Sequence, residues 1–410
     1  MAGVKSGALT WTLPAGASAE PADKLGLSGI VTEMLQRGAG GLTSREHADA
    51  LDAAGVCGRG AGGALNGVFR SLSLGIEVRF AELGATFVGQ DFDRAIPLLA
   101  DMIVRPALEK DAFEPSQSLA IQELEALADD PEERADVEAM ARHLPEPLNR
   151  STYGSREGLE ACTHTDAMAF HQSRYVPEGS TISLAGDVDP GLAEACLNAA
   201  LTGWSGSASI PEATGEAQRG TVHVEDDSAQ VQVMVIREAP RDGTPGAACE
   251  RVAAAVLSGG MSGRLFTEVR EKRGLCYAVH ARYTPERERG WLTSYVGTTP
   301  DRAHESLDVL QAELDRLATP AGAPTQEEFD RAVAGLKSRI VFGGESTSAR
   351  AGAMANDYRK LGRCRSLEER VAEIDAVTLD ALRAHLASFD RGNATVLTLG
   401  PSLAGASREA

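Results

Sequence analysis

Hydrophobic and polar residues alternate in several short stretches of the chain, with the period of two that is typical of a half-buried β-strand. Such stretches occur at residues 221–226 (TVHVED), 230–236 (QVQVMVI) and 292–297 (LTSYVG). Longer stretches between them carry apolar residues at helical spacing. Because strands with one polar face are typical of antiparallel sheets, the pattern predicts an α+β fold in which mostly antiparallel sheets pack against helices.

The order of these elements occurs twice along the chain. Residues 87–95 (FVGQDFDRA) resemble residues 295–303 (YVGTTPDRA), and in both places a strand that ends in aromatic-Val-Gly is followed by an amphipathic helix. Residues 166–171 (DAMAFH) resemble residues 380–385 (DALRAH), and each is followed by a short strand that ends in glycine. Because both the order and the spacing are kept, we predict two homologous domains of roughly 200 residues each.

The segment between the two copies, SGSASIPEATGEAQRG, is rich in small and polar residues, as expected of a surface linker. We therefore expect an N-terminal domain at residues 1–204, a linker at 205–220, a C-terminal domain at 221–401 and a tail at 402–410.

Composition narrows the possible functions. The 410 residues include 40 Lys and Arg against 59 Asp and Glu, a formal net charge of −19. Nucleic-acid binding needs a basic face, so this balance argues against a nucleic-acid partner. No apolar run approaches the roughly 20 residues that span a bilayer, and no secretory signal is recognised at the N-terminus. Six cysteines without a CxxC pair indicate free thiols and a cytoplasmic location.

The negative charge is concentrated in the first half of the chain. Residues 1–205 hold 15 basic and 30 acidic side chains, a balance of −15, whereas residues 206–410 hold 25 and 29, a balance of −4. Much of the excess lies between residues 109 and 146. If this acidic segment faces a bound substrate, we expect it to favour basic peptides.

Residues 25–38 (LGLSGIVTEMLQRG) resemble the opening helix of the pitrilysin/insulinase family of zinc peptidases, which reads roughly G-L-A-H-F-L-E-H-M-L-F-K-G. In that family two histidines four residues apart bind zinc, and the glutamate between them polarises the attacking water. Here Gly29 and Glu33 stand at the histidine positions and Thr32 at the position of the general base.

Glu123 matches the family's third zinc ligand, a glutamate on a later helix. Without the two histidines, Glu123 is more simply interpreted as one acid on a solvated helical face. The resemblance thus implies a degenerate zinc motif, and neither a metal nor another cofactor is expected in this chain.

Residues 258–277 (SGGMSGRLFTEVREKRGLCY) resemble a segment from the family's C-terminal half. There an arginine and a tyrosine seven residues apart reach the zinc centre of the facing half, and Arg270 and Tyr277 hold those positions. A guanidinium can bind a substrate carbonyl, and a phenol can donate to the oxyanion at the scissile carbon. The residues alone also allow a charged helix surface at Arg270 and the start of a core strand at Tyr277. The resemblance further implies a substrate-binding turn at Gly259, Gly260, Met261 and Ser262.

The resemblance covers nearly the whole chain, from about residue 8 to residue 400, and implies a fold like that of mitochondrial processing peptidase. Family members usually begin with one additional strand. The first sheet is therefore expected to lack an edge strand or to recruit one from a partner.

Some members of the family work as pairs, in which an inactive subunit supplies the arginine and tyrosine to a zinc-bearing paralogue. By this resemblance the chain is expected to be the non-catalytic subunit of a zinc-dependent metalloendopeptidase complex, inactive alone. The expected partners are a zinc-bearing paralogous subunit, or a second copy of the chain, and a peptide substrate.

Two alternative functions stay open. One is an inactive structural or peptide-binding scaffold, like the core subunits of respiratory complex III, and the other is a self-sufficient peptidase with a rebuilt metal site.

Overall fold

The computed structural model describes residues 4–56 and 72–402, and the chain forms two compact units. The first unit comprises Met1–Ala126, Glu146–Gly215 and Gly344–Tyr358, and the second comprises Leu127–Pro145, Glu216–Gly343 and Arg359–Ala410. Each unit thus contains one segment from the opposite half of the sequence. The contiguous domain limits predicted above stay a prediction, and the predicted tail, apart from residue 402, lies outside the described residues.

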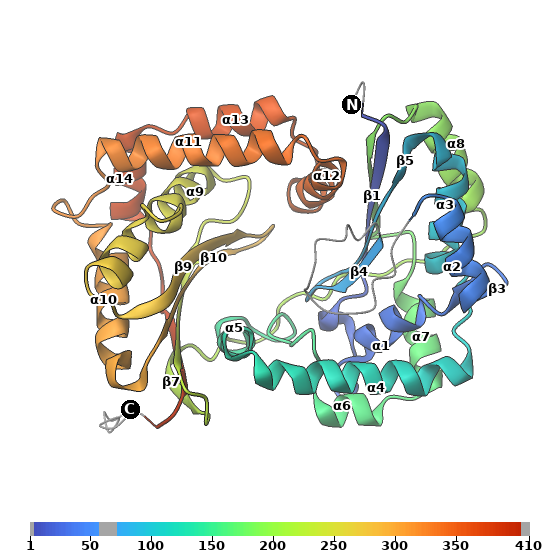
Figure 1. Ribbon diagram of the computed structural model, residues 1–410, viewed down its shortest axis with the longest axis horizontal. Helices are drawn as coiled ribbons and strands as arrows, with labels where there is room; N and C mark the ends of the chain where they lie inside the picture. The colour runs from blue at the N-terminus through green and yellow to red at the C-terminus, as the bar shows by residue number, and fades with distance from the viewer. Residues whose placement is uncertain (1–3, 57–71, 403–410) are drawn as a thin grey trace. The chain divides into compact units, whose positions relative to one another are not determined.

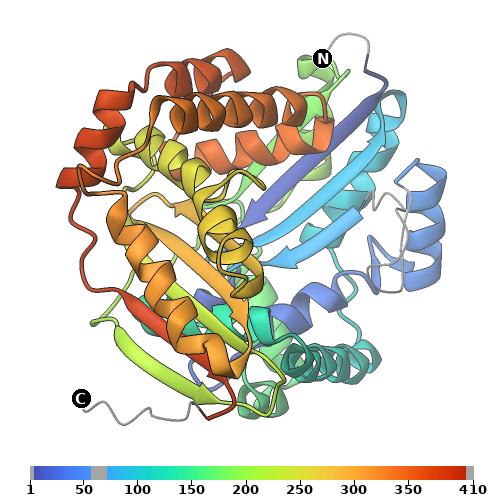
Figure 2. The same ribbon diagram turned by 60° about the vertical axis from the view of Figure 1, so that its left-hand side comes forward.

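The first unit is built on a four-stranded antiparallel sheet (Figures 1 and 2). Its strand order is β4-β5-β1-β6, and β1 pairs with two neighbours: Ser6 lies opposite Val88, and Gly7 lies opposite Gly186. A short ribbon of two further strands accompanies the sheet. The strands are β1 (Ser6–Leu13), β2 (Gly38–Ala39), β3 (Leu42–Thr43), β4 (Leu72–Ile76), β5 (Ala81–Val88) and β6 (Thr181–Gly186).

Helices cover one face of this sheet, where Leu9, Trp11 and Leu13 of β1 are buried in the main core of the unit. The indole of Trp11 packs edge-on against Trp204, with ring centroids 5.3 Å apart. The helices are η1 (Ala17–Ala19), α1 (Leu27–Met34), α2 (Ser44–Ala53), η2 (Gly89–Asp91), α3 (Phe92–Val104), α4 (Lys110–Ala126), α6 (Arg156–Ala161), α7 (His164–Arg174) and α8 (Pro190–Ala200).

The opposite face of β1 is polar but equally buried, since Thr10 and Thr12 each expose only 5% of their surface. This face is reached by α12 (Thr347–Leu361), most of which belongs to the first unit. The hydroxyl groups of Ser6 and Thr347 lie 3.2 Å apart. A segment more than 300 residues away in sequence therefore completes the surroundings of the first strand.

The second unit is built on a five-stranded sheet of order β7-β11-β8-β10-β9. All neighbours are antiparallel except β7 and β11, which run parallel with Thr395 opposite Gly220. The strands are β7 (Gly220–Glu225), β8 (Val231–Ala239), β9 (Cys276–Pro285), β10 (Gly290–Thr298) and β11 (Thr395–Gly400).

Both faces of this sheet are covered. On one face Val231, Val233 and Val235 pack into the main core of the unit, and on the other Met234 and Ile236 pack against Ala135 and Ala139 of α5. The expectation of half-exposed strands is therefore wrong for β8 and β10, because α5 buries the second face. The helices are η3 (Leu127–Asp129), α5 (Pro131–His143), α9 (Pro245–Ser258), η4 (Phe266–Glu271), η5 (Pro300–Arg302), α10 (Ala303–Arg316), α11 (Gln326–Gly343), α13 (Leu367–Asp375) and α14 (Leu379–Ser388).

The two sheets confirm the internal repeat. Strands β4, β5, β1 and β6 follow one another in the first sheet as β9, β10, β8 and β11 do in the second. The second sheet continues past β11 with β7, whereas no described residue forms a strand against the outer edge of β6. The described part of the first sheet thus has no counterpart of β7. The predicted α+β fold is confirmed.

No helix in the described ranges combines the length and the apolar character that a membrane span requires.

Candidate functional site

The degenerate motif lies on α1, whose first turn is held by a buried carboxylate. Glu20 is 4% exposed and accepts hydrogen bonds from the backbone N–H groups of Gly26 and Ser28, both at 2.8 Å, and from the Ser28 hydroxyl. Burial raises the pKa of Glu20, while these hydrogen bonds oppose the rise. Gly26 precedes the helix with φ 102°, a conformation that favours glycine. The Glu20 carboxylate therefore fixes the N-terminal end of α1, because it accepts hydrogen bonds from backbone N–H groups that have no partner within the helix.

The three motif positions have different surroundings. A side chain at Gly29 would meet no atom of residues 4–56 or 72–402 within 4 Å, so these residues leave room for a side chain at the position of the first family histidine. Glu33 is half-buried and forms an ion pair with Arg37 at 3.0 Å on the same helix. Residues 29 and 33 are four apart and share one face of α1.

Thr32, at the position of the general base, is buried and 7% exposed. Its hydroxyl lies 3.2 Å from the hydroxyl of Tyr175, which follows α7. Burial raises the pKa of Tyr175 to about 12, so the phenol stays protonated at neutral pH. Two neutral hydroxyls thus occupy the place where a zinc peptidase needs a carboxylate, and neither can act as a general base near pH 7.

Glu123 lies on α4, which packs against α1, and its carboxylate is close enough to Glu33 for the two charges to interact. The pKa of Glu123 is raised, first by partial desolvation and then by the negative charge of Glu33. The structure therefore brings together two of the positions that the family resemblance assigned to zinc.

These residues do not fit a zinc site. Protein-bound catalytic zinc takes three protein ligands, commonly with histidine nitrogens among them. Position 29 has no side-chain donor, and Thr32 is engaged with Tyr175. Within residues 4–56 and 72–402, no three His, Cys, Asp or Glu side chains are grouped so as to hold a metal ion. Of the positions that the resemblance assigned to zinc, only Glu33 and Glu123 could supply a ligand, which is one fewer than a catalytic zinc site needs.

The second candidate site begins at the C-terminal end of α9 in the second unit. The predicted substrate-binding turn is exposed there, and the side chain of Met261 is 78% exposed. Gly260 has φ 142°, and a side chain at Gly259 would collide with the Ala255 carbonyl oxygen at 2.4 Å. Both positions therefore require glycine, which explains the Gly-Gly pair of the motif.

Arg264 anchors the chain directly after this turn. Its guanidinium makes a bidentate ion pair with Glu328 of α11, at 2.6 and 2.7 Å, and donates to the carbonyl of Gly322 at 2.6 Å. Burial alone would raise the pKa of Glu328, but hydrogen bonds from Arg264 and Thr325 lower it to about 2. Arg264 is thus a structural residue that fixes the start of the segment 264–277, called the Arg270 segment below because it carries Arg270.

Arg270 and Tyr277 are in contact with each other. Arg270 lies on the π-helical turn η4 and Tyr277 on β9, and the Arg270 guanidinium carbon is 5.1 Å from the Tyr277 ring centroid. The same guanidinium is 4.8 Å from the ring of Phe266, so two aromatic faces hold it by cation–π contact. Tyr277 is 80% exposed, which excludes the alternative that it is a core residue.

The polar atoms of this pair have no partner among the described residues. The neighbouring cations differ, because Lys272 and Arg273 both form ion pairs with Glu268, at 2.7 and 3.0 Å. Arg270 makes no ion pair in the described ranges, and the Tyr277 hydroxyl makes no hydrogen bond there. The structure therefore presents one guanidinium and one phenol, oriented by aromatic stacking and available to a ligand.

Sequence reasoning missed several residues that shape these sites. Glu20 and Tyr175 carry no recognised pattern. Phe266 lies within the matched segment 258–277, and its position four residues before Arg270 on one helical turn is the signal that could have found it. The roles of Glu20 and Tyr175 follow from tertiary contacts, which a single sequence does not display.

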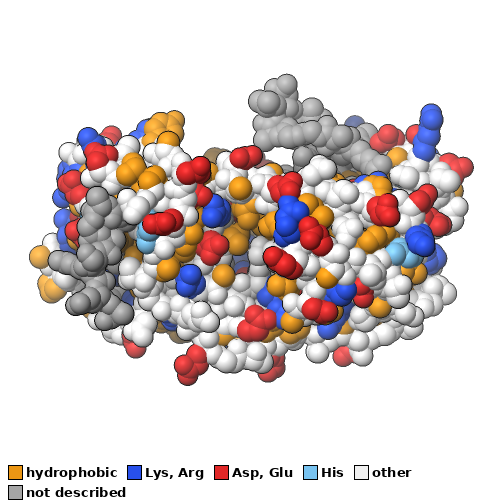
Figure 3. Space-filling model, turned by 90° about the horizontal axis from the view of Figure 1, so that it is seen from below, with side chains coloured by type: hydrophobic (Ala, Val, Ile, Leu, Met, Phe, Trp, Pro, Cys, Tyr) orange, Lys and Arg blue, Asp and Glu red, His pale blue; other side chains and the backbone are white. Residues whose placement is uncertain are grey.

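The acidic segment between residues 109 and 146 is divided between the units, with α4 in the first and α5 in the second. Around α4 and α6, Arg156 forms ion pairs with both Glu125 and Glu160. Figure 3, seen from below, shows acidic side chains interspersed with basic and hydrophobic ones. The affinity for basic peptides stays a prediction, and this face offers no continuous acidic surface to support it.

Comparison with known proteins gives a consistent result. A family model described as the peptidase M16 inactive domain matches residues 161–336. An uncharacterized zinc protease of Mycobacterium tuberculosis is 29% identical over 329 residues, which cover 77% of this chain and 74% of that protein.

Two solved structures show the same fold. One is a peptidase M16 inactive domain from Pseudomonas fluorescens, with a TM-score of 0.82 and 21% identity over 98% of this chain and 93% of that one. The other is a chain of complex III2 from Candida albicans with Inz-5 bound, with a TM-score of 0.79 and 16% identity over 98% of this chain and 92% of that one.

Proposed function

We propose that this chain, which is similar to peptidase M16 inactive-domain proteins and to proteins named zinc proteases, is the non-catalytic subunit of a zinc-dependent metalloendopeptidase complex. In this role it binds peptide and supplies Arg270 and Tyr277 to the zinc site of a partner. The observation that carries the proposal is the contrast between the two candidate sites. The motif on α1 has lost its ligands, whereas the Arg270–Tyr277 pair is intact, oriented and without a polar partner among the described residues.

The chemistry of the pair suits peptide hydrolysis. Arg270 can donate to the carbonyl oxygen of a bound peptide, because no carboxylate of residues 4–56 or 72–402 forms an ion pair with its guanidinium. Tyr277 can donate its phenolic proton to the oxyanion as the tetrahedral intermediate forms. The partner's zinc would polarise the carbonyl and activate water when bound, and this chain's residues would orient the substrate and stabilise charge.

Peptide binding by this chain is supported by the turn after α9. Met261 is a flexible, exposed apolar side chain on a turn whose glycines fix its course. In the second unit, the exposed Met261 would offer an apolar contact to a peptide and the Arg270 guanidinium a polar one.

The test is reconstitution with a zinc-bearing paralogue and a quenched fluorescent peptide. We expect Tyr277→Phe to lower the turnover of the complex by about 100-fold, the magnitude typical of a lost oxyanion donor, and Arg270→Ala by about tenfold or more. Arg273→Ala and Tyr358→Phe are matched controls, because both positions are exposed and lie outside the pair. We expect each control to stay within about twofold of the unsubstituted complex.

The same experiment separates the proposal from a scaffold role. If the complex forms and its turnover is unchanged by both Arg270→Ala and Tyr277→Phe, the pair does not act on the substrate and the chain is a scaffold. Melting temperatures of the variants are measured in parallel. Since neither side chain makes an ion pair or hydrogen bond within the described ranges, both variants should melt close to the unsubstituted chain.

A further inference from the structure

A cavity of about 410 Å³ opens into the second unit, lined by residues of strands β8 and β10 and of helices α9, α10 and α14. Its volume lies within the range of small-molecule sites. Part of its lining belongs to the main core of the unit and is at most 7% exposed: Ala253, Leu257, Leu292, Leu314, Leu317 and Leu386. The cavity therefore reaches the interior of the unit.

This apolar floor sets what the inner part of the cavity can hold. The side chains of leucine and alanine neither donate nor accept hydrogen bonds, so a polar group placed there would lose its hydration without compensation. An aliphatic group would instead gain from leaving water. At the mouth the lining is different, because Asp315, Ala318 and Ala387 are exposed there. A fitting ligand therefore has an aliphatic body, and any polar group that it carries lies at the mouth.

The charged side chains of the lining neutralise one another. Arg237 pairs with Asp315 at 2.6 Å, and Arg391 makes a bidentate ion pair with Glu250 at 2.6 and 2.9 Å. Glu250 is completely buried and also accepts a hydrogen bond from His385 at 2.8 Å. Burial alone would raise the pKa of Glu250, but the hydrogen bonds from His385 and Arg391 lower it, so the carboxylate stays ionised. Two cations and two anions thus line the cavity, and their charges balance.

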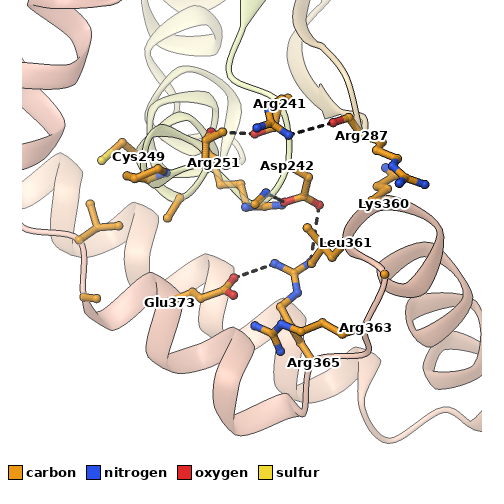
Figure 4. A pocket seen from close by; sticks show the side chains of 18 of the residues that line it. Arg241, Asp242, Cys249, Arg251, Arg287, Lys360, Leu361, Arg363, Arg365 and Glu373 are labelled. Carbon is orange, nitrogen blue, oxygen red and sulfur yellow. Dashed lines mark hydrogen bonds and ion pairs between the residues drawn. The ribbon is translucent and has the colours of Figure 1, made fainter.

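The larger pocket at the N-terminal end of α9 has a different balance of charge (Figure 4). Six basic side chains and two carboxylates line it. Figure 4 shows its Asp242 between Arg251 and Arg365, which both form ion pairs with this carboxylate. Arg241 and Arg287 are exposed and make no ion pair within the described ranges. That pocket therefore carries a positive excess, whereas the 410 Å³ cavity carries none.

We propose that the 410 Å³ cavity binds an uncharged small molecule with an aliphatic body and a single hydroxyl group. A charged head would meet both signs of charge in the lining, so attraction and repulsion offset each other while the head loses its hydration. A hydroxyl oxygen can accept a hydrogen bond from Arg237, whose guanidinium uses one of its five donors on Asp315. This inference is independent of the proposed function, because no residue of the lining belongs to the Arg270 segment.

The probe is 1-octanol, titrated calorimetrically into the full chain, with octanoate and octylammonium as charged counterparts of equal chain length. We expect saturable binding of 1-octanol at one site per chain, about tenfold tighter or more than the binding of either ion. Ala387→Trp places an indole at the mouth and should weaken the binding of 1-octanol by about tenfold or more. The matched control is Ala384→Trp, which is exposed on the same helix but lies outside the lining. It should bind within about twofold of the unsubstituted chain.

Several results would overturn the inference. These are the absence of saturable 1-octanol binding, unchanged affinity in Ala387→Trp, equal weakening by Ala384→Trp, or an ion that binds as tightly as 1-octanol. The melting temperatures of both tryptophan variants should stay close to that of the unsubstituted chain, since both positions are exposed. If Ala387→Trp is destabilised, Ala318→Trp blocks the mouth from the segment just after α10 and provides the same test.

Discussion

The hydroxyl of Thr32 lies 3.2 Å from the hydroxyl of Tyr175 in the interior of the first unit. The contact engages the α1 position that the sequence resemblance aligned with the family's general base. The arrangement satisfies both polar groups, so Thr32 is a packed part of the core.

The first prediction concerns this pair. Thr32→Val and Tyr175→Phe should each lower the free energy of unfolding by about 1 kcal/mol, because each leaves one buried hydroxyl without its partner. The double variant should cost less than the sum of the two, with a coupling of about 1 kcal/mol, measured by urea unfolding of all four proteins. Additive effects would show that the hydroxyls do not interact.

The second prediction is a gain of metal binding. Gly29→His/Glu33→His should bind about one zinc per chain, because the direction of a side chain at position 29 is open and Glu123 lies beside position 33. Metal analysis after dialysis against zinc measures the gain. Adding Glu123→Gln to this variant should abolish it.

The control for that gain is the unsubstituted chain, in which Glu33 and Glu123 supply only two carboxylates. We expect it to retain substoichiometric zinc under the same dialysis. If it retains one equivalent, the interpretation of α1 as a degenerate site is wrong. The gain should not restore hydrolysis, since Thr32 supplies no general base.

The third prediction is a pH dependence at the anchor of the Arg270 segment. The folded-state pKa of Glu328, about 2, is below the ordinary value of 4.5, so its ion pair with Arg264 stabilises the folded chain above pH 4.5. This contribution is lost as the pH falls from 4.5 towards 2, where the carboxylate is protonated in the folded state too. Glu328→Gln should therefore cost about 3 kcal/mol at pH 7 and progressively less below pH 4.5.

Urea unfolding of Glu328→Gln and the unsubstituted chain at pH 7, 4 and 3 measures this difference. Glu327→Gln is the matched control, because Glu327 is the exposed neighbour whose ion pair with Arg331 lies on the surface of α11. Its cost should stay below about 0.5 kcal/mol at every pH. A constant cost of Glu328→Gln across the three pH values would contradict the prediction.

The fourth prediction concerns the carboxylate that holds α1. Glu20→Ala removes the acceptor of two backbone N–H groups and one hydroxyl, and should destabilise the first unit by about 3 kcal/mol. Amide hydrogen exchange of residues 26–28 should accelerate more than that of α3, which Glu20 does not contact. Equal acceleration in α1 and α3 would indicate general destabilisation instead of the loss of a cap.

Much of the fold could be predicted from local patterns. The two copies of the unit follow from short matches such as residues 87–95 and 295–303, because each marks a strand end and the helix after it. Alternation failed at β8, whose residues are buried on both faces. The reason is α5, a helix from the first half of the sequence whose packing partners no local pattern reveals.

The candidate sites show the same limit. Arg270 and the turn at Gly259 could be found because motif spacing records residues that lie close in sequence. The hydrogen bond between Thr32 and Tyr175, 143 residues later, required coordinates. Motif spacing thus locates a site in the sequence, whereas tertiary packing brings in the distant residues that contact its side chains.

The exchange of segments between the halves of the chain has a consequence for its biosynthesis. Ser6 of β1 contacts Thr347, 341 residues later, and His143 of α5 contacts Thr395, 252 residues later. Neither unit can therefore be completed on the ribosome before nearly the whole chain has been translated. The first sheet gains its contact with α12 only after residue 347 has been synthesised.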